Sequence, residues 1–349
     1  MKRTILLSAL LIISNFSFAQ TIRRVTNLPG AATGVNTYAT VNEAMAAAAS
    51  GDIIYIEPSA TPYAGFNVTK TLHFIGNGNF LEQNSNTPYE KSNSYIEGRV
   101  YFDANSNSST ASGLYFGAQV DIMNTIGVEI KKCRLAKGIF LNANTSGTLI
   151  SENLIVNDVA GKADNSSAQS TTLKNNIIES GNVSYLKNST IKNNTIYYYY
   201  SSTLINNQGC TITNNILDRR VINSVYDVSG NNTGSTVTNN LQVLSASAVL
   251  PSANPDSNKN LYTGNFNNIY VVNNPWVSND LIKDADFKLV AGSSAIGMGT
   301  FNTDAGAYGG DTPYTLSGLP NIPIITSAVS STTGTNSVPL NVIISVRSN

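Results

Sequence analysis

The chain carries the segment Thr172-Leu173-Lys174-Asn175-Asn176-Ile177-Ile178, in which an Asn-Asn pair lies between apolar residues. Further copies of this segment, two of them weaker, begin at Glu129, Leu149, Thr190, Thr211 and Thr236. Repeats of this kind indicate stacked supersecondary units that share one continuous core. The stretch from Leu173 to Leu217 therefore predicts a solenoid.

The second Asn of each pair marks one position per repeat, and Cys133 stands at that position in the first copy. Successive positions, counted from Cys133, lie 20, 23, 18, 21 and 25 residues apart. About 20 residues suffice for one turn of a parallel β-helix with two or three short strands. The longer intervals place insertions in loops, which grow at little cost in free energy.

Side-chain alternation predicts what faces inward. Ile191 and Ile196 point into the core on either side of Asn194, and Asn tolerates the left-handed conformation that a tight corner needs. Amides stacked at roughly 4.8 Å per turn can bond to those above and below. We expect an internal ladder of Asn153, Asn176, Asn194, Asn215 and Asn240. Cys133 is expected to plug the first rung, roughly 19 Å from Cys210, which is too far for a disulfide.

Charge and the N-terminus limit the functions open to this protein. The 21 basic and 21 acidic side chains balance, so there is no overall electrostatic footprint for nucleic acid. Residues 1–19 combine Lys2-Arg3, a short apolar run and Ser17-Phe18-Ala19, which is typical of a secretory signal peptide. No later segment is long enough to cross a bilayer. The protein is therefore expected to be secreted, to the extracellular space or the outer cell surface.

The N-terminal region predicts a cap. Thr40 and Glu43 are spaced as a capping box, and the alanine run after them predicts a helix over residues 41–49. Together with Gly51-Asp52 and Leu72-His73-Phe74-Ile75-Gly76, this opening resembles that of secreted, Bacteroidota-like right-handed parallel β-helix proteins of the pectin-lyase-like kind. The resemblance implies that the helix covers the open end of the solenoid, and that the corner Asn ladder is present. Covering that end would protect exposed strand edges from aggregation.

The C-terminal region predicts an ending and a tail. Asp286-Phe287-Lys288-Leu289 and the glycine-rich residues 304–310 resemble the ending of the same family, which implies that these glycines serve close turns at the last coil. We therefore expect the solenoid over residues 20–312. Residues 313–349 are punctuated by prolines and contain alternating apolar residues, which predict one or two strands against the flank of the last coils.

A candidate site follows from two outward-facing columns. Three residues after the ladder position lie Glu179, Tyr197 and Asp218, which we expect as neighbours on one exposed sheet face. Two carboxylates flanking a tyrosine platform suit a sugar. Glu179 and Asp218 are the candidate catalytic residues, roughly 9–10 Å apart, near the upper end for an inverting glycosidase pair. The candidate carbohydrate-binding residues are Asp158, Tyr197, Tyr199 and Arg220. Ordinary solvated strand residues would give the same pattern.

Other chemistry has less support. A lyase needs a basic residue and often Ca²⁺, and residues 131–137 are basic, but the chain has no dense cluster of Asp and Glu. No metal or other cofactor is therefore predicted. The single histidine, His73, cannot form a His-based metal site alone.

These observations predict an exported, monomeric, all-β protein. Its fold is a right-handed parallel β-helix with a short N-terminal capping helix and a C-terminal strand tail. The favoured function is non-catalytic, with polysaccharide bound along the exposed sheet face. The alternatives are a polysaccharide lyase or glycoside hydrolase, and a structural or adhesive rod.

Overall fold

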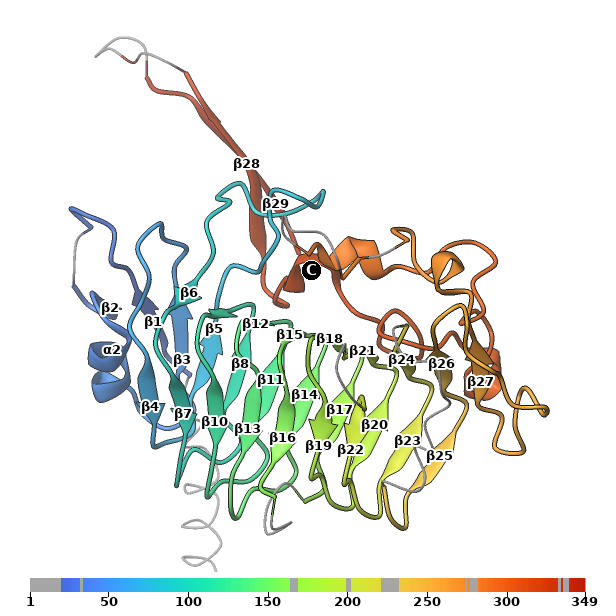
Figure 1. The fold of residues 1–349 in the computed structure, drawn as a ribbon. Helices are drawn as coiled ribbons and strands as arrows, with labels where there is room; N and C mark the ends of the chain where they lie inside the picture. The colour runs from blue at the N-terminus through green and yellow to red at the C-terminus, as the bar shows by residue number, and fades with distance from the viewer. Residues whose placement is uncertain are drawn as a thin grey trace, which may run out of the picture.

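The computed structural model describes residues 20–31, 34–163, 169–198, 202–220, 232–273, 275–276, 282–331, 334 and 339–348. The predicted signal peptide, residues 1–19, lies outside them. The described residues form an all-β parallel solenoid of about 10 turns, which confirms the predicted fold class (Figure 1).

Three parallel sheets, A, B and C, form the solenoid, and the chain visits them in that order in every turn from β5 to β22. In the described residues, sheet A has eleven strands: β2 (Thr37–Tyr38), β1 (Ile22–Val25), β3 (Ile53–Ile56), β5 (His73–Ile75), β8 (Thr110–Ser112), β11 (Glu129–Lys131), β14 (Leu149–Ser151), β17 (Thr172–Lys174), β20 (Thr190–Lys192), β23 (Thr211–Thr213) and β25 (Thr236–Thr238). Sheet B has nine described strands: β6 (Tyr95–Ile96), β9 (Tyr115–Phe116), β12 (Arg134–Leu135), β15 (Leu154–Val156), β18 (Ile177–Glu179), β21 (Thr195–Tyr197), β24 (Ile216–Asp218), β26 (Leu241–Val243) and β27 (Leu261–Thr263). Sheet C has seven described strands: β4 (Phe66–Val68), β7 (Val100–Phe102), β10 (Val120–Ile122), β13 (Ile139–Leu141), β16 (Val159–Gly161), β19 (Val183–Ser184) and β22 (Leu204–Ile205).

The corner between sheets A and B is made by the first Asn of each pair. Asn193 lies between β20 and β21 with φ of 53°, and Asn175, Asn214 and Asn239 repeat this left-handed conformation. Asn adopts it more readily than most residues. The expectation that the second, ladder Asn bends the chain is therefore wrong. Its neighbour turns the chain, which leaves the ladder side chain free to point inward.

The predicted internal ladder is present. Each Nδ2 donates to the Oδ1 of the next rung, at 2.9 Å from Asn153 to Asn176 and at 3.0 Å from Asn194 to Asn215. The intervening and final predicted pairs, Asn176 to Asn194 and Asn215 to Asn240, are both 2.9 Å long. The ladder extends to Asn260, a rung that the repeat did not predict. Cys133 fills the first rung and donates its N–H to Asn153, and it and Cys210 are free thiols buried in the interior. The buried side-chain amides of the ladder thus find their hydrogen-bond partners in the equivalent Asn residues of the neighbouring turns.

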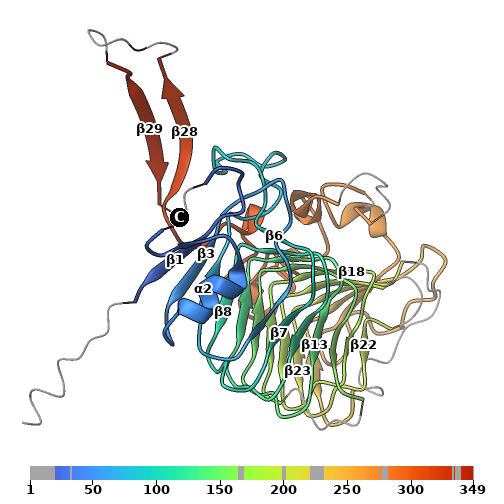
Figure 2. The ribbon, with the colours of Figure 1, turned by 90° about the vertical axis from the view of Figure 1, so that its left-hand side faces the viewer.

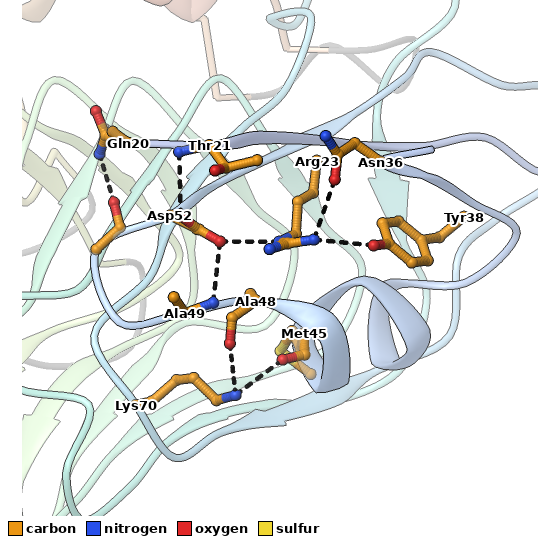
Figure 3. A network of polar contacts seen from close by, with 11 residues as sticks. Gln20, Thr21, Arg23, Asn36, Tyr38, Met45, Ala48, Ala49, Asp52 and Lys70 are labelled. Carbon is orange, nitrogen blue, oxygen red and sulfur yellow. Dashed lines mark hydrogen bonds and ion pairs between the residues drawn. The ribbon is translucent and has the colours of Figure 1, made fainter. Parts of the chain in front are cut away.

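The N-terminal end of the solenoid carries the predicted cap, α2 (Val41–Ala47), which lies across that end in Figure 2. The capping box of Thr40 and Glu43 is formed. The helix ends two residues earlier than predicted, because Ala48 is extended and Ala49 donates its N–H to Asp52 Oδ2 at 2.9 Å. Lys70 Nζ donates to the carbonyls of Met45 and Ala48, which helps to satisfy the helix C-terminus (Figure 3).

Asp52 is the centre of this cap (Figure 3). Its carboxylate accepts hydrogen bonds from Arg23 Nε at 2.8 Å and from the N–H of Thr21 at 3.1 Å. Burial alone would raise the pKa of Asp52, but these bonds and that of Ala49 outweigh it and lower the pKa. Arg23 also donates to Tyr38, so β1, β2 and the loop after α2 are joined.

The C-terminal segment returns along the A–B corner, and we call its residues 298–321 the strap. It is pinned by the residues that turn that corner: Asn239 donates to the Met298 carbonyl at 3.2 Å, Asn193 to Asp304 at 3.2 Å, and Asn175 to Gly309 at 2.7 Å. Further toward the N-terminus, Thr315 donates to Glu152, and Lys132 donates to Asn321. The strap therefore runs antiparallel to the order of the turns.

The glycine-rich ending belongs to this strap, so the expected position of its glycines at the last coil is wrong, whereas a close turn is present at Gly309, whose N–H donates to the Gly306 carbonyl at 3.0 Å. A Cβ on Gly309 would lie 1.9 Å from the Asp304 carbonyl oxygen, and one on Gly306 would lie 2.6 Å from Ile216 Cδ1. Gly310, with φ of 74°, presses against the Asn193 side chain. These glycines let the strap approach the solenoid closely.

The tail after the strap forms a hairpin of β28 (Ile324–Ser330) and β29 (Val342–Arg347), paired antiparallel. It projects away from the solenoid, with its base near the first turns (Figure 1). The Tyr89 N–H donates to the Ile325 carbonyl at 2.7 Å, and every residue of β29 is exposed. The expected position against the last coils is therefore wrong, because the strap carries the chain back to the other end.

Candidate functional site

The outer face of sheet B brings together the three residues of the predicted site. Glu179 pairs with Tyr197, and Tyr197 pairs with Asp218, on adjacent strands β18, β21 and β24. The three residues that the repeat predicted to lie in one column are thus neighbours on adjacent strands.

The predicted exposure of this column is wrong. Asp218 is 0% exposed, Tyr197 is 6% exposed, and Arg220 is 7% exposed. The cause is a cover from the C-terminal region that includes Trp276, η2 (Asp284–Phe287) and part of the strap, shown above sheet B in Figure 1. The Trp276 ring stacks on Tyr197 with centroids 4.6 Å apart. The face of the Tyr197 ring that was expected to bind a sugar is therefore covered by Trp276.

Asp218 and Arg220 form a buried ion pair beneath this cover. Arg220 Nε donates to Asp218 Oδ1 at 3.0 Å, and the Arg220 Nη2 donates to Oδ2. Trp276 Nε1 also donates to Oδ2, at 2.9 Å. Burial alone would lower the pKa of Arg220, but the bonds and charge of Asp218 outweigh it and raise the pKa. The Asp218 carboxylate therefore holds the cover in place through its hydrogen bond from Trp276.

Glu179 lies at the edge of the cover and stays half-buried. Burial raises the pKa of its carboxyl to about 6, against an opposing effect from the positive charge of Arg134. A carboxyl with such a pKa can exchange protons near neutral pH. Of the two candidate catalytic residues, Glu179 is the one that a ligand could reach.

Asp158, another candidate residue, is separated from this group. Asp158 is exposed in the turn after sheet B, where its Oδ1 accepts the N–H of Asn182 at 2.8 Å. Tyr199 lies outside the described residues. The five described residues of the predicted constellation therefore divide into a buried group, an accessible glutamate and an exposed aspartate.

Toward the N-terminus the same face is less deeply covered, and we call this part the open strip. Its half-buried outward side chains come from five successive turns: Tyr95, Tyr115, Arg134, Ala136, Val156 and Glu179. The rings of Tyr95 and Tyr115 lie 4.7 Å apart, and the Arg134 guanidinium lies 4.6 Å from the Tyr115 centroid and 4.8 Å from that of Phe80. Within the described residues, Arg134 forms no ion pair with a carboxylate.

Sequence reasoning missed Tyr95 and Tyr115 of the open strip, and it considered Arg134 only as part of the basic stretch 131–137. They occupy the position one residue after the ladder, which also faces outward because side chains alternate. In later turns that position holds Leu154, Ile177 and Ile216, which are buried under the cover. The change from apolar to aromatic and basic residues along this one column was the available signal.

No group of three or more His, Cys, Asp or Glu side chains in the described part of the chain is placed to hold a metal ion. Among the same residues, no helix has the length and apolar character needed to span a membrane. No protein-family model matches this sequence, and no curated protein is significantly similar to it.

Proposed function

We propose that this chain is an exported, extracellular or surface-located protein that binds polysaccharide along the open strip without cleaving it. The observation that supports this most directly is the stack of Tyr95, Tyr115 and Arg134 in one outward column. Aromatic rings offer an apolar face and a polar edge to a sugar, and a guanidinium binds carboxylates through paired hydrogen bonds. Export rests on the signal-peptide pattern of residues 1–19.

The burial of Asp218 favours binding over hydrolysis by the predicted pair. An inverting glycosidase needs both carboxylates to face one substrate, with room for a water molecule between them. Asp218 instead accepts hydrogen bonds from Arg220 and Trp276 within the cover. Only Glu179 remains available, so the pair is incomplete on this surface.

Cleavage is the second candidate, because of Glu179. Its pKa of about 6 is suited to a general acid or base near neutral pH. Arg134 is close enough to influence that pKa and could neutralise an acidic sugar. A lyase or hydrolase that relies on this single carboxylate is the alternative to a binding protein.

Affinity electrophoresis of the mature protein in gels containing acidic or neutral polysaccharides tests the binding proposal. Tyr115→Ala and Arg134→Gln should each weaken retention about tenfold, as for a loss of roughly 1.4 kcal/mol. Tyr101→Ala is the matched control, since Tyr101 faces outward on sheet C with Arg99 5.4 Å from its ring centroid. Retention that is equal in all three variants and the native protein would overturn the open strip as the binding surface.

Product analysis separates the remaining possibilities. Unsaturated products would indicate a lyase, and new reducing ends without unsaturation a hydrolase. Either activity should disappear in Glu179→Gln. Failure of every polysaccharide to retain the native protein would favour a structural or adhesive rod.

A further inference from the structure

A hollow of ≈ 980 Å³ lies at the C-terminal end of the solenoid, away from the open strip. One wall is the A–B corner at Asn239 with Lys259 and Leu261 of the next turn, and the other is the start of the strap, including η3 (Thr300–Asn302). Figure 1 shows β27, which begins at Leu261, in this end region. Its volume is in the range of about 300–1,000 Å³ that is usual for small-molecule sites.

Phe301 stands at the mouth of this hollow with its side chain fully exposed. Its φ is 58° and its ψ is 32°, a left-handed conformation that is a genuine outlier for a bulky residue. Such strain costs about 1–2 kcal/mol, and no buried contact of the ring compensates for it. An exposed aromatic ring in a strained position is a feature that a fold alone does not require.

The turn that carries Phe301 is held firmly. Gly299 donates its N–H to the Thr303 carbonyl at 2.7 Å, and Thr303 Oγ1 donates to the Thr300 carbonyl at 2.9 Å. Asn214 anchors the turn to the solenoid, since its Oδ1 accepts the Thr300 N–H at 3.1 Å and its Nδ2 donates to Thr300 Oγ1 at 2.9 Å. The Phe301 ring is therefore presented by a braced turn.

The hollow is lined, within the described residues, by one charged side chain, a cation, and the Asp304 carboxylate accepts the N–H of the lining residue Gly297 at 2.9 Å. Of the described residues that line it, Lys259 is the one with a charged side chain, and it is exposed and forms no ion pair with any described carboxylate. Asn239 and Asn302 add amide groups, and Met298 and Leu261 add apolar surface. The lining thus combines a flat ring, hydrogen-bonding groups and one cation.

We propose that this hollow is a second binding site, for a short saccharide that bears an acidic group, either a carboxylate or a sulfate ester. The apolar face of one sugar ring stacks on Phe301, the acidic group pairs with Lys259, and hydroxyls bond to the amides of Asn239 and Asn302. This site is independent of the open strip and does not require that the strip bind polysaccharide.

Isothermal titration of the full mature protein with three trisaccharides tests this proposal: a uronic-acid, a sulfated and a neutral one of equal length. Phe301→Ala should weaken binding of the acidic ligands about tenfold or more, and Lys259→Gln should weaken it while leaving any neutral binding unchanged. Val249→Ala, which shortens another highly exposed apolar side chain, is the control. Phe301→Gly should lose binding while its melting temperature stays equal or rises, because glycine relieves the left-handed strain.

Binding of only one acidic trisaccharide, or of both, supports the proposal and distinguishes the carboxylate from the sulfate. Equal binding of the neutral trisaccharide, or no effect of Phe301→Ala and Lys259→Gln, overturns it. The open-strip variants Tyr115→Ala and Arg134→Gln should bind the trisaccharides normally. If those variants lose polysaccharide retention but the native protein binds no trisaccharide, the proposal for the hollow is wrong and the proposal for the open strip stands.

Discussion

The two halves of the outer face of sheet B are built from the same columns of side chains but differ in exposure. In turns β6 to β18 the columns carry Tyr95, Tyr115, Arg134 and Glu179, which are half-buried, although Leu154 and Ile177 of the last two of these turns already lie under the cover. In turns β21 to β26 the corresponding positions, including Tyr197 and Asp218, are buried under Trp276 and its neighbours. Strand register determines which residues are neighbours in a solenoid, but not whether they meet solvent.

The difference shows how one repeated scaffold supports two tasks. The covered half uses an aromatic and a carboxylate to hold the C-terminal region, through the Tyr197–Trp276 stack and the Asp218–Arg220 pair. The open half keeps an aromatic stack and a carboxyl available. The same residue types thus serve cohesion in one place and, on our proposal, recognition in the other.

The largest expected effect comes from removing the buried carboxylate. Asp218→Ala removes the carboxylate that accepts hydrogen bonds from the buried Arg220 guanidinium and from Trp276, which should lower the free energy of unfolding by about 3–5 kcal/mol. Chemical denaturation of the native and variant proteins measures this loss. The exposed Asp158→Ala is the matched control and should lower stability by only about 1 kcal/mol, since it loses one exposed bond, that from the Asn182 N–H.

A double variant sharpens this test. In Asp218→Ala/Arg220→Met the buried positive charge is removed together with its carboxylate, so much of the lost stability should return. Equal stability of the single variant and the native protein would mean that the pair does not hold the cover.

A smaller effect is expected where the strap is pinned to the corner. Asn193→Gly keeps the left-handed backbone but removes the bond from Asn193 Nδ2 to the Asp304 carbonyl, a loss of about 1 kcal/mol. Limited proteolysis should then cut residues 298–321 faster than in the native protein. Asn188→Gly, at an exposed corner with φ of 48° and no contact with the strap, should leave the cleavage rate unchanged. Equal rates in both variants would show that the glycine-rich packing alone holds the strap.

The scaffold could be predicted from the repeat, because each of its interactions recurs from one turn to the next. Each rung of the Asn ladder is satisfied by copies of itself one turn away, so Asn176 and Asn194 could be assigned from periodicity alone. The capping box of Thr40 and Glu43 spans only three residues. Interactions of this kind can be predicted from the spacing of residues in the sequence.

The cover could not be predicted, because its contacts have no period. Trp276 and Asp218 are 58 residues apart, and Asn84, which donates to Asp284, is 200 residues from it. The outward Asn of each pair has the same appearance in the sequence whether it meets solvent or, like Asn175, holds the strap. Exposure of the candidate site therefore depended on a segment whose path the repeat does not encode.

The smallest expected effect concerns the carboxyl of the open half. The pKa of Glu179 is raised from 4.5 to about 6 in the folded protein, so the native state binds its proton more tightly than the unfolded chain. Its contribution to stability is present below pH 4.5 and is lost as the pH rises through 6. Glu179→Gln should therefore be more stable than the native protein at pH 7, by about 1 kcal/mol after allowance for partial exposure, and equal to it at pH 4. Thermal unfolding measured across this range checks the prediction. A variant that is less stable at pH 7 would mean that ionised Glu179 supports Arg134 structurally, and that the two halves of sheet B both use their carboxylates for cohesion.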